Sequence, residues 1–569
     1  MDSSSVPASS PEPPQALPAS PPFSCARRTA WLAAAALWAC IYLPGLGSLE
    51  LQGNEAKRIL PALHMIASGD WLIPELGGVT YINKPPLIYW MVAGSFLASG
   101  SRTELPARMP SVLMILAFAS VLILMPSTFF GVPARLAAAL IFMTIVSFIE
   151  KGRQIEIEAS FVAVTGIATV WWLNAWAAGS SRWATWFVPC IVLGIGLLLK
   201  GPLILLFFYA VVLMVLARTR RLRDALVAPH LLGIVVMLAM LLWWVVYVWL
   251  TKAGASANLQ YEVGSRFTPK DIDYAGWMGT WLKVLVDFLP WALLLPFLWS
   301  RTWMAALPAR QQQVFAACRL ALVVAYVLVN AMPATRSRYS MPLFPLAALL
   351  LGWLLAAQPP RPLLSPLWRR LVLSAVFVCL IASVVGALLM PTGFLFMLIG
   401  RFGGPHIAVQ ATASQYILAS GVFVAASVAA AAAMRLRHWL YSPLNLAVAT
   451  GVVIAVVMLG FAAFALPVIT SFESKRPVGV KINGVIPAGE PVHICSFAYE
   501  PFLFYIHRPI VPVSSNSIPA GVRWLLVPNE ELPELRKLPR LGQASIALDV
   551  TYRKKNRYIL LDLREPGPK

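Results

Sequence analysis

Charged residues are scarce in this chain, and acidic residues are the scarcest of all. Only 12% of its 569 residues are charged, and 24 are acidic, whereas 59% are hydrophobic. Strict alternation of apolar and polar residues is also lacking, which excludes a membrane β-barrel. Apolar runs of roughly 20 residues recur instead, and each is long enough to cross a bilayer as a helix. The sequence therefore predicts a polytopic α-helical membrane protein.

Cysteine is rare as well, and its spacing excludes a disulfide framework or a zinc site. Most of the six cysteines lie inside apolar runs: Cys25, Cys40, Cys190, Cys318, Cys379 and Cys495. The net charge of +21 would indicate a nucleic acid partner in a soluble protein. Here, however, the bases lie in short loops between apolar runs, where Lys and Arg set membrane orientation. We therefore expect the lipid bilayer, and no nucleic acid, as a partner.

The apolar runs predict about thirteen transmembrane helices. They are expected at residues 29–46, 110–129, 133–148, 159–178, 183–199, 202–217, 231–250, 277–299, 314–332, 341–356, 371–390, 416–434 and 444–469. Residues 1–24 are rich in Pro and Ser and predict a disordered cytoplasmic leader. Residues 25–469 then form a transmembrane domain, and residues 470–569 a separate tail.

The positions of arginine predict the orientation. With the amino terminus in the cytoplasm, every loop assigned to the cytoplasm carries Arg, including "RTRRLR" at 218–223. The outer face then receives the long loop 48–107 and the tail. In that loop, "NEAKRILPALHMIASG" and "LIYWMVAGSFLASG" are short and amphipathic, which predicts interfacial helices.

The tail at 470–569 changes character and predicts a small α/β domain on the outer, periplasmic side. The stretches "PVHICSFA", "RWLLVP", "ASIALDVTY" and "RYILLDLR" are typical of strands. Between them, "EPFLFYIHR" and "NEELPELRKL" are typical of helices.

Charged residues gather in the outer loops, several of them at the expected ends of spans. They are Glu55, Lys57, Arg58, Lys84, Lys151, Arg153, Glu156, Glu158, Lys200, Glu262, Arg266, Arg336 and Arg338. Polar groups near hydrocarbon are costly and are often kept for a function. Cations on this face oppose the orientation bias and indicate an anionic ligand, such as a phosphate. A lipid-linked phosphate fits best, because its tail needs an apolar groove, and nearby carboxylates would act as a base or orient an acceptor.

The stretch "GNEAKRILPALHMIASGDWLIPELGGVTYINKPPLIYW" at 53–90 resembles the first outer loop of a known group of enzymes. These are the bacterial membrane glycosyltransferases related to lipid A aminoarabinose transferase and to protein O-mannosyltransferases. The elements "ASGDW" and "NKPP" occur in the same order. The resemblance continues through "GRQIEIEAS", "LLLKGP" and "SRYSMPLFPLAALL", and covers most of the membrane part.

The resemblance implies a membrane-embedded (GT-C type) glycosyltransferase of the bacterial inner membrane. Such an enzyme moves a sugar from a polyprenyl-phosphate donor to a lipid A-like or other envelope acceptor, with inversion, on the periplasmic face. Lys84 matches the lysine expected to bind the donor phosphate, and Lys200 and Tyr339 match further elements of the pattern. Asn54 stands where relatives most often have Asp, so the carboxylate role is expected to move to Glu55 or Glu158.

The predicted site combines carboxylates, cations and a tyrosine. The catalytic candidates are Glu55, Glu158 and Asn54. The candidates for binding the donor phosphate are Lys84, Arg58, Lys200, Arg338 and Tyr339. Further candidates are Lys57, Tyr81, Arg153, Glu156 and Arg266. No metal ligand or cofactor is assigned, although a divalent metal ion stays open. The expected partners are a polyprenyl-phosphate-linked sugar and a lipid or glycan acceptor, bound by a monomer.

Simpler explanations and other functions remain as alternatives. Glu55 would cap a helix, Arg153, Glu156 and Glu158 would form a salt-bridged loop, and Tyr339 would anchor the chain at the membrane surface. The alternative functions are a lipid or sugar transporter or flippase, a protein O-glycosyltransferase, and a noncatalytic membrane module. A transporter predicts charges or helix breaks in mid-span and internal repeats. Neither is evident, and the long first loop argues against it.

Overall fold

The computed structural model describes residues 27–252, 274–332, 335–357, 442–470, 475–495, 500–514, 518–542, 544–552 and 556–563, and the single positions 370, 374, 421 and 424. The predicted leader, the predicted spans at 371–390 and 416–434, and Arg266 lie outside these ranges, apart from three of the single positions.

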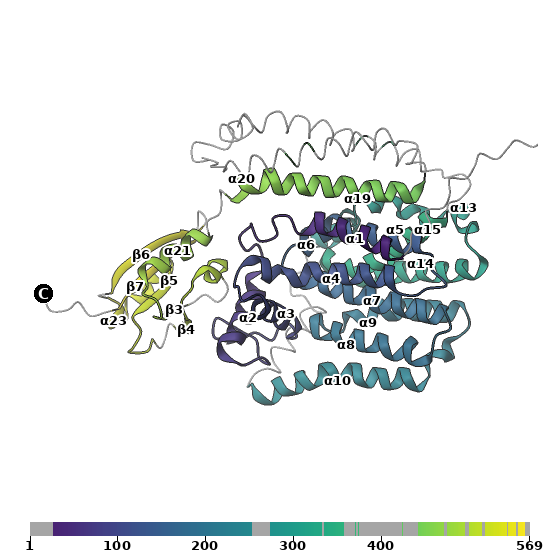
Figure 1. Ribbon diagram of the computed structural model, residues 1–569. Helices are drawn as coiled ribbons and strands as arrows, with labels where there is room; N and C mark the ends of the chain where they lie inside the picture. Colours follow the sequence, from purple (N-terminus) through teal and green to yellow (C-terminus); the bar gives the residue numbers. More distant parts are fainter. Residues whose placement is uncertain are drawn as a thin grey trace, which may run out of the picture.

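Apolar helices with roughly parallel axes form the larger part of the molecule (Figure 1). Its α-helices are α1 (Arg27–Tyr42), α4 (Glu104–Leu124), α5 (Val132–Met143), α6 (Val146–Gly152), α7 (Ile157–Ala177), α8 (Val188–Lys200), α9 (Leu203–Arg218), α10 (Ala228–Thr251), α12 (Tyr274–Asp287), α13 (Arg301–Ala305), α14 (Ala309–Asn330), α15 (Phe344–Ala357), α19 (Pro443–Gly460) and α20 (Leu466–Thr470). Shorter 3-10 and π segments join them: η1 (Trp183–Phe187), η2 (Leu222–Ala225), η3 (Trp291–Trp299), η4 (Ser337–Tyr339), η5 (Met341–Leu343) and η7 (Phe461–Ala465).

Several of these helices have the length and composition of membrane spans. Among the described residues, six helices qualify, or eight if each of two bent pairs is one span. The pairs are α5 with α6, bent by 64°, and α12 with η3, bent by 96°. The prediction of a polytopic helical membrane protein is confirmed at this level, while the number thirteen stays a prediction. Helix α4 begins at Glu104, earlier than predicted, because its polar first turns are buried against partners described below.

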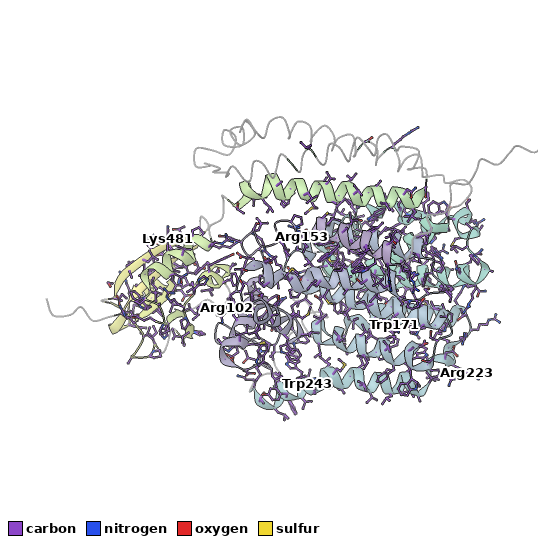
Figure 2. All side chains as sticks on the ribbon, viewed as in Figure 1. Arg102, Arg153, Trp171, Arg223, Trp243 and Lys481 are labelled. Carbon is purple, nitrogen blue, oxygen red and sulfur yellow. The ribbon has the colours of Figure 1, made fainter. Side chains whose placement is uncertain are left out.

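The two ends of the bundle differ in their charged residues. Figure 2 shows Arg223 at the end opposite to Arg102 and Lys481. At the arginine-rich end, Arg310 Nη2 donates to the carbonyl of Ala177, which ends α7. The carboxyl end of α7 therefore lies beside the beginning of α14. Which end faces the cytoplasm stays a prediction.

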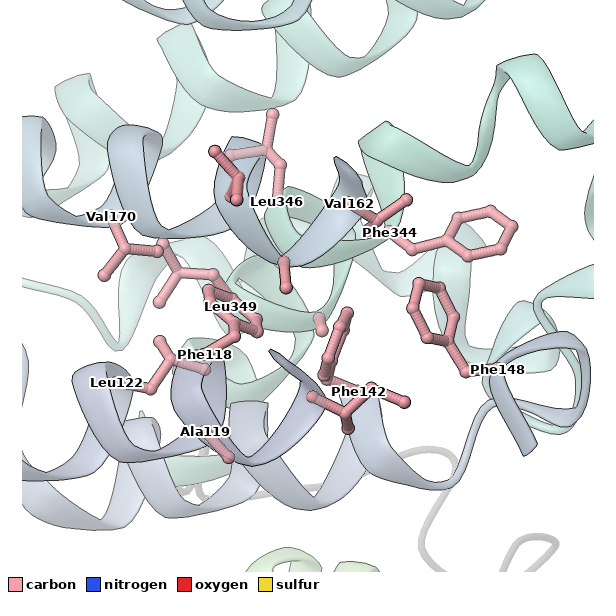
Figure 3. Close-up of a cluster of buried hydrophobic side chains, with 14 of the residues drawn as sticks. Phe118, Ala119, Leu122, Phe142, Phe148, Val162, Val170, Phe344, Leu346 and Leu349 are labelled. Atoms are coloured by element: carbon pink, nitrogen blue, oxygen red, sulfur yellow. The ribbon is translucent and has the colours of Figure 1, made fainter. Parts of the chain in front are cut away.

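Aromatic rings interlock at the centre of the bundle (Figure 3). The ring of Phe142 on α5 lies 4.6 Å from those of Phe118 on α4 and Phe148 on α6, measured between centroids. The ring of Phe344, at the start of α15, lies 6.2 Å from that of Phe148. Such edge-to-face and tilted pairs stabilise a core beyond their buried area.

The first loop folds into two helices and a hairpin, beside the ends of the spans. They are α2 (Ala56–Ser68), β1 (Glu75–Leu76), β2 (Val79–Thr80) and α3 (Leu87–Ser99). Helices are present in both predicted stretches, while their interfacial placement stays a prediction. Trp244 of α10 donates its indole N–H to the carbonyl of Leu72 at 2.8 Å, which fixes the loop to the bundle.

The tail folds around a five-stranded mixed sheet with the order β4-β3-β5-β7-β6. Its elements are α21 (Lys475–Val485), β3 (Val492–Cys495), η8 (Pro501–Tyr505), β4 (Ile510–Val513), β5 (Trp524–Pro528), α22 (Leu532–Leu535), α23 (Pro539–Gly542), β6 (Ser545–Tyr552) and β7 (Asn556–Asp562). Strand β3 is parallel to β4 and β5, whereas β7 is antiparallel to β5 and β6. Four strands match the predicted stretches. The short β4 was not predicted, because Pro512 interrupts its pattern.

Two buried carboxylates join the tail to the membrane part. Glu104, at the start of α4, accepts hydrogen bonds from Arg476 Nη2 at 2.8 Å and from the Tyr505 hydroxyl at 2.9 Å. Glu50 accepts bonds from the backbone N–H groups of Lys475 and Arg476. The beginning of the tail is therefore held directly against the first loop.

Gly352 of α15 lets this helix pack closely on α5. A Cβ atom at Gly352 would lie 2.5 Å from the Ala138 nitrogen and 2.6 Å from the Ala134 carbonyl oxygen, and backbone cannot move aside easily. We expect Gly352→Ala to lower the free energy of unfolding by about 1–3 kcal/mol. Thermal unfolding of the detergent-solubilised protein measures this.

The matched control is Gly94→Ala in α3, where an added Cβ meets no atom within 4 Å. Since alanine favours a helix over glycine, this variant should be neutral or more stable by up to about 1 kcal/mol. Equal melting temperatures for the two variants would contradict the close packing of α5 and α15.

Candidate functional site

Glu55 and Arg108 form a buried ion pair at the base of the first loop. Arg108 donates from Nε to Glu55 Oε1 at 2.9 Å and from Nη2 to Oε2 at 2.8 Å. The backbone N–H groups of Ile155 and Gln52 complete two hydrogen bonds to each oxygen. Arg108 Nη1 also donates to the carbonyls of Leu46 and Leu49.

This pairing gives Glu55 a structural position. Its side chain is 0% exposed, and both of its oxygens are occupied by protein donors. A carboxylate in this state has no free lone pair for a substrate, so we leave Glu55 out of the catalytic group. Its bond to the N–H of Ile155 instead holds the segment that leads to Glu156.

A second acidic cluster lies where α7 begins. Glu156 is the residue before α7, and Glu158 lies in its first turn. Lys200, the last residue of α8, donates from Nζ to Glu158 Oε1 at 3.0 Å. Arg338 of η4 approaches the same oxygen with its Nε at 3.6 Å. Residues from α7, α8 and η4 therefore meet at one end of the bundle.

Aromatic rings surround the Lys200 ammonium. Its Nζ lies 5.4 Å from the ring centroid of Phe161 and 5.1 Å from that of Tyr339. Arg338 also lies over the Tyr339 ring, at 5.8 Å. Ring faces attract cations and exclude water, which strengthens charge interactions at this position.

Arg58 of α2 adds a third cation to this end. It is 9% exposed, and the Tyr89 hydroxyl of α3 lies close to it. Within the described ranges, Arg58 Nε and Nη1 and the Tyr89 hydroxyl have no hydrogen-bond partner. Burial opposes the charge of Arg58, yet neighbouring Tyr89, Tyr81, Glu156 and Glu158 keep its pKa above the ordinary value.

Glu156 has a carboxylate oxygen without a hydrogen-bond donor among the described residues. It is 5% exposed, and among the residues that the structure describes none donates a hydrogen bond to its Oε2. Burial, followed by the neighbouring Glu158 charge, raises the pKa of Glu156 to about 7, although Arg58 works in the opposite direction. Unpaired buried donors and an unpaired buried carboxylate in one place indicate a ligand-binding site.

The other predicted site residues have varied surroundings. Arg153 donates to the carbonyls of Ile41, Tyr42 and Pro44, so it caps the end of α1. Asn54 and Lys57 are half-buried at the beginning of α2. Lys84 lies on the turn that leads to α3, and its Nζ donates to the carbonyl of Asn83 at 2.7 Å.

Sequence reasoning missed Tyr89, Arg108 and Phe161. Tyr89 and Phe161 lie within apolar helices, where aromatic residues carry no separate signal. Arg108 lies just before the predicted start of a span, and nothing in the sequence indicates its burial at 3% exposure or its partner Glu55. Within the described part of the chain, no three His, Cys, Asp or Glu side chains form a group that could hold a metal ion.

An apolar cavity of about 330 Å³ lies beside the segment that follows Tyr339. Leu343 and Phe344 line it, together with residues of α12, η3, α14 and α15. Its wall is almost entirely apolar, because the Tyr326 hydroxyl and the Trp299 indole N–H are the only polar side-chain groups among its lining residues. Such a wall suits a hydrocarbon chain.

Comparisons with known proteins give a consistent result. Residues 83–247 match the family model of the dolichyl-phosphate-mannose-protein mannosyltransferases. An undecaprenyl phosphate-alpha-4-amino-4-deoxy-L-arabinose arabinosyl transferase of Sodalis glossinidius is 27% identical over 46% of this chain and 48% of its own length. One from Pseudomonas paraeruginosa is 27% identical over 57% and 59%. The matched part of the chain thus spans about half the length of these relatives.

Solved structures extend the similarity in fold. The crystal structure of ArnT from Cupriavidus metallidurans in the apo state is similar with a TM-score of 0.67 and 18% identity, covering 96% of this chain and 100% of that one. The same enzyme bound to undecaprenyl phosphate is similar with a TM-score of 0.67 and 16% identity. At these identities the likeness concerns the fold.

The ion pair of Glu55 and Arg108 predicts a large stability effect. Arg108→Met leaves the Glu55 carboxylate buried without its cation, so we expect a loss of about 3–5 kcal/mol in the free energy of unfolding. Thermal unfolding in detergent measures it. The double variant Glu55→Gln/Arg108→Met should recover part of the loss. Arg102→Gln, an exposed arginine of the same loop, should leave the melting temperature unchanged.

Proposed function

Because the chain is related to the membrane-embedded glycosyltransferases that include ArnT and the protein mannosyltransferases, we propose that it is a glycosyltransferase of this kind. It transfers a sugar from a polyprenyl-phosphate donor to a lipid A-like acceptor, with inversion, on the periplasmic face. The observation that carries this proposal is the convergence of Arg58, Lys200 and Arg338 around Glu156 and Glu158.

The cations would hold the phosphate of the donor. The Nε and Nη1 atoms of Arg58, which have no hydrogen-bond partner among the described residues, suit a fork of acceptors such as phosphate oxygens, which guanidinium groups bind well. Lys200 and Arg338 are kept in place by Glu158 before the donor arrives. They stabilise the negative charge that grows on the phosphate as it leaves. Lys84 is proposed as a further phosphate ligand from the adjoining turn.

The transfer proceeds in one displacement. The acceptor oxygen forms a bond to the anomeric carbon while the bond from that carbon to the phosphate oxygen breaks. The polyprenyl phosphate leaves with the electron pair, and the sugar inverts. A phosphate acceptor is already ionised near neutral pH and needs positioning and charge neutralisation more than a base. Glu156, largely protonated below pH 7, can lie beside such an anion without repelling it.

The membrane part would bind the polyprenyl tail of the donor. The apolar cavity beside Leu343 and Phe344 is proposed to take part of the polyprenyl tail while the head group lies at Lys200 and Arg338. The chain is then a monomeric, multi-pass inner-membrane enzyme, with its amino terminus in the cytoplasm and its tail in the periplasm. The undecaprenyl phosphate-bound ArnT structure supports this class of donor.

A protein acceptor is the second candidate. The matching family model is that of the dolichyl-phosphate-mannose-protein mannosyltransferases, and the acceptor would then be a side-chain hydroxyl group of a protein. A hydroxyl acceptor must lose its proton, and Glu156 would then act as the base in its ionised form. The pH dependence of the rate distinguishes the two acceptors.

Removing a cation of the cluster should reduce sugar transfer. We expect Lys200→Met and Arg58→Met to lower kcat/KM by about a hundredfold, since a preorganised charge at the leaving phosphate is lost. The purified enzyme is assayed with undecaprenyl phosphate-linked aminoarabinose and lipid A, and product is measured by mass spectrometry. Lys481→Gln, an exposed change in the tail, is the control. Wild-type rates in both variants would refute the site.

The rate should fall as the pH rises through about 7. Above that pH Glu156 becomes an anion beside an anionic acceptor, so kcat/KM should decline about tenfold for each further pH unit. Glu156→Gln should remove this decline, while Glu150→Gln, an exposed neighbour in sequence, should retain it. A rate that rises through pH 7 in the wild type, and not in Glu156→Gln, would indicate a hydroxyl acceptor.

A further inference from the structure

A second pocket lies at the arginine-rich end of the bundle, on the far side from Lys200 and Glu158. The last turn of α9, the carboxyl end of η3 and the middle of α14 enclose it. Its lining includes Arg218, Arg319, Trp299, Ala316, Leu320 and Val323. The cavity has a volume of about 530 Å³. Apart from the two arginines, its wall is apolar except for the indole N–H of Trp299.

Arg218 and Arg319 both line this pocket. Arg218 is the last residue of α9, and its charge is near enough to Arg319 for the two guanidinium groups to repel each other. None of the ion pairs within the described part of the chain includes Arg218 or Arg319. Two like charges next to hydrocarbon, without an acidic partner, are unfavourable unless an anion joins them.

Arg319 differs from the arginines that set membrane orientation. Those lie in loops, whereas Arg319 is ten residues after Ala309, about 15 Å along α14. Its Nη1 donates to the carbonyl of Leu298 at 3.0 Å, and its guanidinium lies 5.5 Å from the Trp299 ring. A single bond and a ring face hold the guanidinium at the pocket wall and leave donors for a ligand.

We propose that this pocket binds an anionic phospholipid of the leaflet at the arginine-rich end. Its phosphate lies between Arg218 and Arg319, and one acyl chain follows Ala316, Leu320 and Val323. The two positive charges favour an anionic head group, and the apolar wall favours a lipid over a soluble anion. This inference does not depend on the proposed sugar transfer.

The pocket also adjoins the apolar cavity of the proposed donor site. Trp299 and Val323 line both spaces. An acyl chain from one leaflet and a polyprenyl tail from the other would therefore meet along α14. The lipid closes the groove at this end, and it would stabilise α14 against η3 and α9.

Lipid retention by the full chain tests the proposal. The protein is placed in nanodiscs of phosphatidylcholine with or without phosphatidylglycerol, extracted gently, and examined by native mass spectrometry and thermal unfolding. The wild type should retain phosphatidylglycerol and melt at a higher temperature when it is present. Arg218→Gln/Arg319→Gln should retain about tenfold less.

The matched control is Arg182→Gln/Arg223→Gln, which removes two exposed arginines at the same end of the bundle but outside the pocket. Its retention should equal that of the wild type, and equal losses in both double variants would overturn the proposal. Arg218→Lys/Arg319→Lys keeps the charges and should keep most of the lipid. It therefore serves if the glutamine variant fails to fold.

Two further experiments distinguish a lipid ligand from other anions. Leu320→Trp fills the exposed mouth of the pocket without changing charge, so it should reduce retention of phosphatidylglycerol as well. Inorganic phosphate alone, added to protein in phosphatidylcholine nanodiscs, should not raise the melting temperature. A phosphate effect as large as that of phosphatidylglycerol would show a soluble-anion site and refute the lipid assignment.

Discussion

The buried ion pair of Glu55 and Arg108 is the contact on which the geometry of the outer end depends. One carboxylate receives the guanidinium fork from α4, the N–H of Gln52 from the first loop, and the N–H of Ile155 from the segment before α7. Three stretches that are distant in the sequence are thus fixed at a single side chain. Because the pair lies away from water, the loss of either partner would leave a buried charge uncompensated and destabilise the fold.

The proposed site is built on this fixed base but uses different charges. The helix that follows Glu55 carries Arg58, and the segment bonded at Ile155 leads directly to Glu156. Lys200 and Arg338 arrive from the ends of other elements and meet at Glu158. Glu158 therefore holds the cations, and Glu156 remains open, although the two carboxylates are only two residues apart.

The sequence predicted where the helices lie along the chain, but it did not predict where they bend. A bilayer imposes a length on apolar runs, and this made the spans visible. The 64° and 96° bends depend on packing between neighbours, which a single sequence does not display. In the site, the motifs pointed to Lys200, Arg338 and Tyr339, which the structure places together. Glu55 was a catalytic candidate because Asn54 stands where relatives have Asp, and the sequence does not show its partner Arg108, which is 53 residues away.

The attachment of the tail has a consequence for how the protein can be divided into fragments in the laboratory. Glu50 and Glu104 are both almost completely buried, and the donors that satisfy them come from Lys475, Arg476 and Tyr505. A shortened chain that ends after the last apolar helix would remove these donors from both carboxylates. The sheet domain is therefore bonded to the membrane part and is not a detachable appendage.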